Sequence, residues 1–525
     1  MNRTRSVGAV LAGAATVMLA LSGMSPATAA LTLPGIVSAR LDSVQVSGTT
    51  VTLKWTDRST TEDAFVVLRR ASGSSNNLQR SDNHSASKAG TGQTYTVTDT
   101  IPAGTRQCYG IMNYDYQGVL GGDVSNEVCT SALPALSAPA LGDGIASSLD
   151  TAVTSGLDNS NAIGSDGLGI TAYYQGGVGG NVQNLRVSHC EDTECTFATT
   201  HDIDTVGDVG RFTSIKIGSD GLPLISYQSY RNASHQFTQD LKVAHCVDIA
   251  CSSATITTLD SAATVDLATS LTIASDGRGS ITYADSSSNF NTMIKVAHCA
   301  NVVCTTATTR VVDTVGKVSA GGVLSIATSP TGLQYIAYQD ATTLKVAACF
   351  SNDCGSSSTQ ITTVYIPGAT ETAGQDPSIS IGRDGLPLIS HRQSTVGGSH
   401  LIVAHCVNIY CSGVTQKVVT TGVSTGSRSS IAIGADGFGV VSYNNAATDN
   451  LEVAHCANLE CTNVTHVTLL DEFGDLGHGG TSVAIGMDGL PLVSYYDITN
   501  TDLKVAHCAD AACAEPLIAP FFKKK

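Results

Sequence analysis

Charged side chains are scarce in this chain of 525 residues, and basic ones are the scarcer kind. Only 14% of the residues are Asp, Glu, Lys or Arg, and the net charge is −16. A surface with this balance repels the phosphates of nucleic acids and of anionic membranes. We therefore exclude nucleic acid as a partner and expect no insertion into a membrane.

Helical periodicity and tryptophan are also missing from most of the chain. No window shows a sustained apolar period of 3.6 residues, so we expect almost no helix. The single tryptophan is Trp55, near the N-terminus. The remaining chain therefore lacks the side chain that most often stacks against sugars. Gly, Ser, Thr, Val and Ala dominate instead, and this composition is unusual for an α/β enzyme.

The longest apolar run lies at the N-terminus. Two arginines precede the run at 7–21, and Ala-Thr-Ala at 27–29 gives a small-x-small cleavage pattern. This pattern is typical of a secretory signal peptide, and the run is too short for a membrane span. No cysteine precedes Cys108, which argues against a lipid anchor. We predict that residues 1–29 are removed and that the protein is secreted and extracellular.

One unit of about 50 residues recurs seven times in the C-terminal part of the chain. The best copy is SVAIGMDGLPLVSYYDITNTDLKVAHCADAAC, from Ser482 to Cys513. It predicts four short strands: A over S-x-x-I, B over L-P-L-V-S-Y, C over D-L-K-V-A-H-C, and D in the Thr/Val-rich segment that follows. An Asp-Gly turn joins strands A and B. Seven such units indicate an all-β fold, a seven-bladed β-propeller.

The ends of the repeat predict how the ring closes. The last unit runs out before its fourth strand, whereas residues 144–151 resemble a strand D placed ahead of the first unit. Asp150 precedes the first Asp-Gly turn by the same offset as Asp260 precedes the third. We predict that residues 144–151 supply strand D of the seventh blade, which leaves fewer open sheet edges.

The sixteen cysteines can all be paired. An even number in a secreted protein predicts disulfides. We expect each C-x4-C pair to bridge the C–D turn between directly opposed strand residues, at about 2 kcal/mol per bridge. The predicted structural disulfides use Cys190 and Cys195, Cys246 and Cys251, Cys299 and Cys304, Cys349 and Cys354, Cys406 and Cys411, Cys456 and Cys461, Cys508 and Cys513, and Cys108 and Cys129.

Zinc is the alternative use of these cysteines. One unit offers only three candidate ligands, and its His and the adjacent Cys point to opposite faces of the strand. We therefore predict no metal site and no cofactor.

A histidine precedes the first cysteine in six units. The fourth unit carries Ala348 there and also lacks the Asp-Gly turn, where it has Thr331-Gly332. This joint loss predicts that a buried imidazole bonds to the turn aspartate or the nearby backbone, as in the polar networks of WD-type propellers. A direct part in function is the alternative. The histidines are His189, His245, His298, His405, His455 and His507.

The segment 33–132 lies outside the repeat. It includes VTLKWTDRSTTEDAFVVLRR and TYTVTDTIPAGTRQCYGIMNYDYQGVLGGDVSNEVCT. It resembles a fibronectin type III domain, a sandwich of two sheets. The resemblance implies an accessory role as a spacer or adhesive module, with Cys108 and Cys129 on the last two strands. It also implies core or strand positions for Trp55, Phe65, Val67 and Leu68.

These patterns predict the order of the parts. The signal peptide at 1–29 and the sandwich at 33–132 come first. A Pro/Ala-rich linker at 133–142 and the propeller at 143–515 follow. A tail at 516–525 ends the chain.

Loop lengths predict where a binding site lies. The A–B and C–D connections are nearly constant in length, whereas the B–C connections vary. In a propeller the B–C and D–A connections share one face, and binding residues concentrate on variable loops of a rigid scaffold. We predict a ligand site on this face near the central channel, with solvated loop decoration as the alternative. The candidate residues are Tyr230, Arg231, His235, Phe290 and Arg392.

Three functions are compatible with these features. The first is a non-catalytic extracellular binding or adhesion protein, whose unknown ligand is a glycan or a cell-surface protein. The second is a glycosidase or lyase, because the G-S-D-G-L-P turn resembles the Asp-box turn of sialidase-like families. That turn is structural, however, and no unit gathers the acids of paired-carboxylate chemistry, so we predict no catalytic residues. The third is a structural spacer associated with the cell envelope.

Overall fold

The computed structural model describes residues 40–47, 50–56, 64–71, 79–86, 93–100, 107–114, 128–129 and 145–514, except 153, 177–182, 262–263, 289, 317–323, 421–423 and 473. Two compact units divide the chain, Met1–Ala138 and Pro139–Lys525, and each is described by itself. The predicted signal peptide, linker and C-terminal tail lie outside the described residues.

The first unit forms two antiparallel sheets. One has the strand order β1-β2-β5 and the other β4-β3-β6-β7. Trp55 is fully buried, stacks on Tyr95 at 5.6 Å between ring centroids and meets Phe65 edge-on. The ladder places Cys108 opposite Cys129. The strands are β1 (Arg40–Ser47), β2 (Thr50–Thr56), β3 (Ala64–Ala71), β4 (Gln79–Ala86), β5 (Thr94–Thr100), β6 (Gln107–Tyr114) and β7 (Val128–Cys129).

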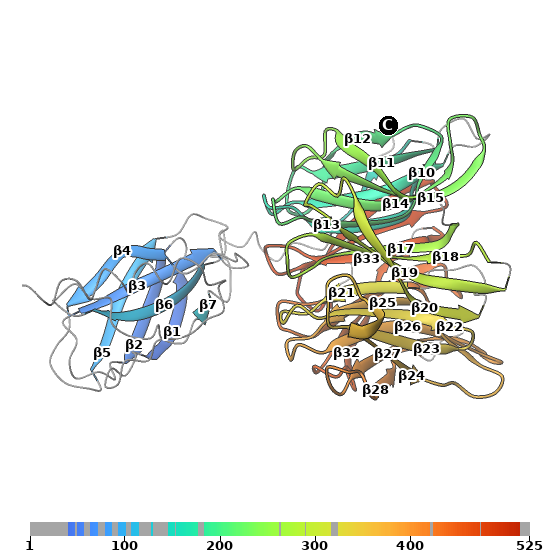
Figure 1. Ribbon diagram of the computed structural model, residues 1–525. Helices are drawn as coiled ribbons and strands as arrows, with labels where there is room; N and C mark the ends of the chain where they lie inside the picture. The colour runs from blue at the N-terminus through green and yellow to red at the C-terminus, as the bar shows by residue number, and fades with distance from the viewer. Residues whose placement is uncertain are drawn as a thin grey trace, which may run out of the picture. The chain divides into compact units, whose positions relative to one another are not determined.

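The second unit is a seven-bladed β-propeller, as the repeat predicts (Figure 1). Each blade is one antiparallel sheet of four strands, in the order A, B, C and D from the channel outward. The described residues contain one helical turn, η1 (Ser356–Ser358), and no described helix has the length and hydropathy to cross a bilayer. The expectation of an all-β fold is therefore confirmed for the residues that the structure describes.

The first four blades have the following strands. Blade 1 contains β9 (Ser155–Ile163), β10 (Gly169–Gly176), β11 (Gln183–Cys190) and β12 (Ala198–Asp204). Blade 2 contains β13 (Asp208–Ile217), β14 (Pro223–Arg231), β15 (Phe237–Cys246) and β16 (Ala254–Asp260). Blade 3 contains β17 (Val265–Ile273), β18 (Gly279–Asp285), β19 (Asn291–Cys299) and β20 (Ala307–Gly316). Blade 4 contains β21 (Leu324–Thr328), β22 (Gln334–Asp340), β23 (Thr343–Cys349) and β24 (Thr359–Tyr365).

The last three blades follow the same plan. Blade 5 contains β25 (Thr372–Ile381), β26 (Pro387–Thr395), β27 (Gly398–Cys406) and β28 (Val414–Val418). Blade 6 contains β29 (Thr425–Ile433), β30 (Gly439–Asn445), β31 (Asn450–Cys456) and β32 (Val464–Asp471). Blade 7 contains β33 (Leu476–Ile485), β34 (Pro491–Asp497), β35 (Asp502–His507) and β8 (Ile145–Asp150).

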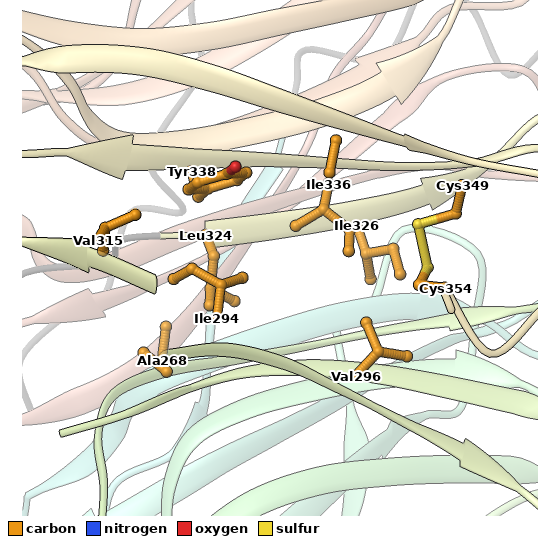
Figure 2. Close-up of a cluster of buried hydrophobic side chains, with 12 residues drawn as sticks. Ala268, Ile294, Val296, Val315, Leu324, Ile326, Ile336, Tyr338, Cys349 and Cys354 are labelled. Atoms are coloured by element: carbon orange, nitrogen blue, oxygen red, sulfur yellow. A yellow bond between two sulfur atoms is a disulfide. The ribbon is translucent and has the colours of Figure 1, made fainter. Parts of the chain in front are cut away.

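Apolar side chains fill the space between neighbouring blades. Between blades 3 and 4, Ile294 and Val296 of β19 pack with Ile326 and Ile336 of blade 4 (Figure 2). Burial of each such side chain contributes roughly 1.5–3 kcal/mol. Both faces of strands B and C are covered by neighbouring blades. Every residue of β18 is therefore buried, and a strand covered on both faces need not alternate apolar and polar residues.

Ring closure follows the prediction. Strand β8 pairs antiparallel with β35 and completes blade 7, so the start and the end of this unit lie in one sheet. The closing strand also contacts blade 1. Asp150 accepts a hydrogen bond from the Tyr173 hydroxyl at 2.6 Å and pairs with Arg186 at 2.5 Å.

All seven C-x4-C pairs form disulfides, as predicted. The expectation that the paired residues oppose one another on strands is wrong. In blade 1, Cys190 faces Ala198 in the ladder, whereas Cys195 lies within the turn with φ of 56°. Since a separation of five residues ends before strand D begins, the bridge closes the C–D turn itself.

The repeated histidines pair with the turn aspartates, as predicted, and the pair meets hydrogen-bond geometry at His245, His298 and His507. In all six blades that carry the histidine, Nε2 lies 2.8–2.9 Å from the Asp carboxylate of the A–B turn. Burial alone would raise the pKa of Asp488, but hydrogen bonds from His507 and the Leu490 backbone lower it below the usual value. The stabilisation from such a carboxylate is present above its unfolded pKa and is lost as the pH falls.

Replacing His455 by Ala is expected to lower the free energy of unfolding by about 1–3 kcal/mol, because the carboxylate of Asp436 and the hydroxyl of Thr465 lose their partner. Chemical denaturation measures this change. His466 faces His455 in the ladder but is exposed, so His466→Ala is the matched control. Unchanged stability together with loss of ligand binding would instead support a direct functional part for the histidines.

A second polar network joins each blade to the next and was not predicted. In five of the seven joints, a strand-D aspartate accepts a hydrogen bond from a strand-B tyrosine and pairs with a strand-C Lys or Arg of the following blade. Burial and the carboxylate raise the pKa of these tyrosines far above the usual value, so the hydroxyl stays a donor. The sets are Asp150, Tyr173 and Arg186; Asp204, Tyr227 and Lys242; Asp260, Tyr283 and Lys295; Asp313, Tyr338 and Lys345; and Asp471, Tyr495 and Lys504.

Two joints depart from this arrangement. Between blades 5 and 6, Thr420 takes the place of the aspartate, and the carboxylate comes from Glu452, which accepts from Tyr443 at 2.5 Å. Between blades 4 and 5 the pair is Tyr365 and His391, with ring centroids 5.9 Å apart. Burial lowers the pKa of His391 to about 4, so this joint is uncharged at neutral pH.

Candidate functional site

A ring of serines borders the central channel. Strand A is the inner edge of each blade, so some of its backbone N–H groups lack a partner strand. The first serine of each S-x-x-I segment accepts one such N–H from the next blade, and the seven bonds of 3.0–3.3 Å close a complete ring. In blade 4 the serine stands in the variant S-I-A-T. The acceptors are Ser160, Ser214, Ser270, Ser325, Ser378, Ser430 and Ser482.

The position two residues before each serine varies in residue type from blade to blade, whereas the serine does not. Blades 1, 2, 5 and 6 have Asp158, Phe212, Asp376 and Arg428 there, with φ between 45° and 55°. Gly480 takes this place in blade 7. Left-handed backbone costs a non-glycine residue about 1–2 kcal/mol. The serine is constant, whereas four blades hold Asp, Phe or Arg at a place where glycine would be least strained.

These side chains line a cavity of about 160 Å³ in the channel. Asp158 pairs with Arg428 at 3.0 Å, and Asp376 pairs with Arg392 at 3.3 Å. Every blade contributes to the lining, which consists of Asp158, Phe212, Thr213, Ala268, Thr269, Leu324, Asp376, Pro377, Arg428, Ser429, Gly479, Gly480 and Thr481. The cavity therefore combines acidic, basic, hydroxyl and apolar groups.

A second cluster lies where blades 1 and 2 meet. The Arg211 guanidinium lies 4.9 Å from the centre of the Tyr174 ring and 4.6 Å from that of Tyr230. The Arg231 guanidinium lies 5.7 Å from the Tyr230 centroid and 4.2 Å from that of Phe237. Burial raises the pKa of Tyr174 to about 12, so its hydroxyl is neutral and accepts a bond from Arg211 at 3.3 Å.

The structure brings together some of the five predicted site residues and not others. Tyr230 and Arg231 share the cluster, and Arg392 reaches the channel through Asp376. His235 lies at the exposed tip of the β14–β15 hairpin, and Phe290 is 81% exposed in the B–C connection of blade 3. The predicted residues therefore lie on three different blades rather than in one compact site.

Sequence reasoning missed the channel residues and Arg211 and Phe237. A weak signal for the channel is present in the aligned repeats: the position two before the serine differs among blades while the serine itself is constant. The side chain at this position matters because a left-handed backbone conformation turns it inward. A residue type such as Phe212 does not predict that conformation.

Comparison with known proteins shows no specific relative. No protein-family model matches the chain, and no curated protein matches it. A protein of unknown function from Dyadobacter fermentans is 12% identical, with a TM-score of 0.44, over 70% of this chain and 97% of that chain. An alpha-L-arabinanase from Penicillium chrysogenum is 12% identical, with a TM-score of 0.41, over 56% and 92%. An ulvan lyase is 10% identical, with a TM-score of 0.38, over 67% and 94%.

Proposed function

We propose that this protein is a secreted, non-catalytic binding protein that recognises an extracellular ligand, a glycan or a cell-surface protein, on the loop face of its propeller. The observation that carries the proposal is the channel ring, where Asp158, Phe212 and Arg428 stand in strained backbone positions beside a constant serine. Strain of this kind is retained where a side chain serves a function.

Exposed apolar side chains also support a binding site on the loop face. Five of them are more than half exposed and lie in the B–C and D–A connections or at the ends of the adjoining strands. Large exposed apolar groups on rigidly held loops favour association with a partner. The residues are Val206, Phe237, Phe290, Ile366 and Val396.

The charges of the cavity favour binding over catalysis. Asp158 and Asp376 each have an arginine partner, whereas glycoside hydrolysis needs a protonated carboxyl beside a free one. The seven disulfides favour an oxidising, extracellular compartment. The N-terminal unit fits a fibronectin type III sandwich, whose role here would be that of a spacer or adhesive module.

A binding screen of the full chain against glycans and cell-surface extracts tests this function. Saturable binding is expected to weaken about tenfold or more when Phe290→Ser and Arg428→Gly are combined, because one exposed aromatic and one channel charge are lost. Gly suits the left-handed backbone of position 428. Phe197→Ser is the control, since Phe197 is 69% exposed beside a C–D turn. Binding that is unaffected by the loop-face pair, or hydrolysis of the bound glycan, would contradict the proposal.

A further inference from the structure

Arg231 is held between aromatic rings at the end of β14. The ladder places it between Asp208 of β13 and Phe237 of β15. Its guanidinium lies 4.2 Å from the centre of the Phe237 ring, within the range of a cation–π interaction. Tyr230 meets Phe237 edge-on at 5.1 Å. The arginine is thus oriented by packing before any ligand arrives.

No carboxylate of the described residues pairs with Arg231. Its neighbour Asp208 is occupied by Arg211, which donates to it at 3.1 and 3.2 Å. The Nε of Arg231 is buried and has no hydrogen-bond acceptor among the described residues. The other arginines of the described propeller residues all have a partner: Arg186, Arg211, Arg278, Arg310, Arg392 and Arg428 pair with aspartates, and Arg383 donates to a carbonyl.

This isolation is unusual in a chain with a net charge of −16. Acidic side chains are abundant, so a cation without a counter-charge here is not the result of a shortage of partners. An unpaired guanidinium on an aromatic platform is suited to bidentate recognition of a planar anion, and above all of a carboxylate. The overall negative charge disfavours a polyanion, which leaves a ligand with a single carboxylate.

The surroundings are pre-organised and offer an apolar surface. The hairpin tip is tied by Asn232, whose side-chain oxygen accepts the backbone N–H groups of Ser234 and Gln236. Phe237 is 61% exposed, so its ring presents a free apolar surface beside the cation. Pre-organisation of this kind lowers the entropic cost of binding.

We propose that Arg231 and Phe237 form a subsite for an acidic sugar residue, whose carboxylate bonds to the guanidinium while the C–H face of the sugar ring packs on Phe237. The subsite rests on the proposed binding function and gives it a ligand class: a glycan with one uronic acid residue in a neutral chain or at its end. A peptide with a free C-terminal carboxylate is the competing source of the same chemistry.

Calorimetric titration of the full chain distinguishes these cases. Methyl β-D-glucuronide is expected to bind at least about tenfold more tightly than methyl β-D-glucoside, because a hydrogen bond to a charged group is lost with the neutral sugar. Arg231→Gln is expected to remove this preference, and Phe237→Leu to weaken both sugars. Arg383→Gln is the matched control, since Arg383 lies in the A–B turn of blade 5. Melting temperatures check that each variant folds.

Three results would overturn the subsite. They are equal affinity for the two sugars, a preference that survives Arg231→Gln, and binding of an N-acetylated dipeptide acid without binding of the glucuronide. The binding function is judged separately. If the glycan screen finds a neutral ligand whose binding depends on Phe290 and Arg428 but not on Arg231, the loop-face function stands and the acidic-sugar subsite falls.

Discussion

Deletion of residues 145–150 from the full chain is expected to lower the free energy of unfolding by about 5 kcal/mol or more. The deletion removes β8, which is strand D of blade 7 and pairs with β35. It also removes Asp150, so that Arg186 of blade 1 keeps only the half-exposed Asp202 as a partner and the Tyr173 hydroxyl loses its acceptor. Removal of one member of a buried ion pair costs roughly 3–5 kcal/mol by itself. Guanidinium denaturation followed by circular dichroism measures the change.

Deletion of six residues from the predicted linker, at 133–138, is the matched control. It shortens the chain equally and leaves β8 in place, so stability should stay unchanged. If the two deletions behave alike, the propeller does not depend on β8 for closure, and the contacts of Asp150 contribute little.

Thr420→Asp and Glu452→Lys are each expected to destabilise the protein by about 3–5 kcal/mol, and the double variant is expected to recover most of this loss. Thr420→Asp alone places a buried carboxylate near the half-buried carboxylate of Glu452. Glu452→Lys alone places a half-buried cation there without a partner and removes the acceptor of Tyr443. Together they recreate the Asp, Tyr and Lys set of five other joints, such as Asp204, Tyr227 and Lys242.

A double-mutant cycle measures this coupling, with the single variants and the wild type compared in the same denaturant series. Lys417→Glu with Thr415→Lys, on the exposed part of β28, is the control pair and should show no coupling. Additive effects of Thr420→Asp and Glu452→Lys would mean that the carboxylate is not exchangeable between the two strands, and the joint would need another explanation.

Repetition made much of the fold predictable from the sequence. The strand patterns, turns and C-x4-C pairs are local, and each recurs in seven copies, so an error in one copy is corrected by the others. The closing strand was found in the same way, because Asp150 stands at the repeat's own spacing. The histidine network was predictable because blade 4 lacks both members, Ala348 and Thr331 standing in their places.

The candidate site was predictable only in part. Variable loop lengths led to Tyr230 and Arg231, which share one cluster, because both lie on the hairpin whose length varies. They did not lead to Arg211, which belongs to strand A of its blade. Nor did they show that much of the variable connection in blade 2 is strand, since β15 begins at Phe237.

The sequence by itself determined what each module is: a four-strand blade, its disulfide, its histidine and aspartate pair, and the number of copies in the ring. Only the tertiary structure decided what meets between modules: the serine ring, the joints such as Asp471 with Tyr495, the inward side chains of the channel, and the isolation of Arg231. The physical reason is the separation along the sequence of the residues that make contact. Contacts within a blade follow from period and turn chemistry, whereas contacts between blades join residues far apart in the chain and depend on backbone conformations, such as φ of 45° at Arg428, that no residue type specifies.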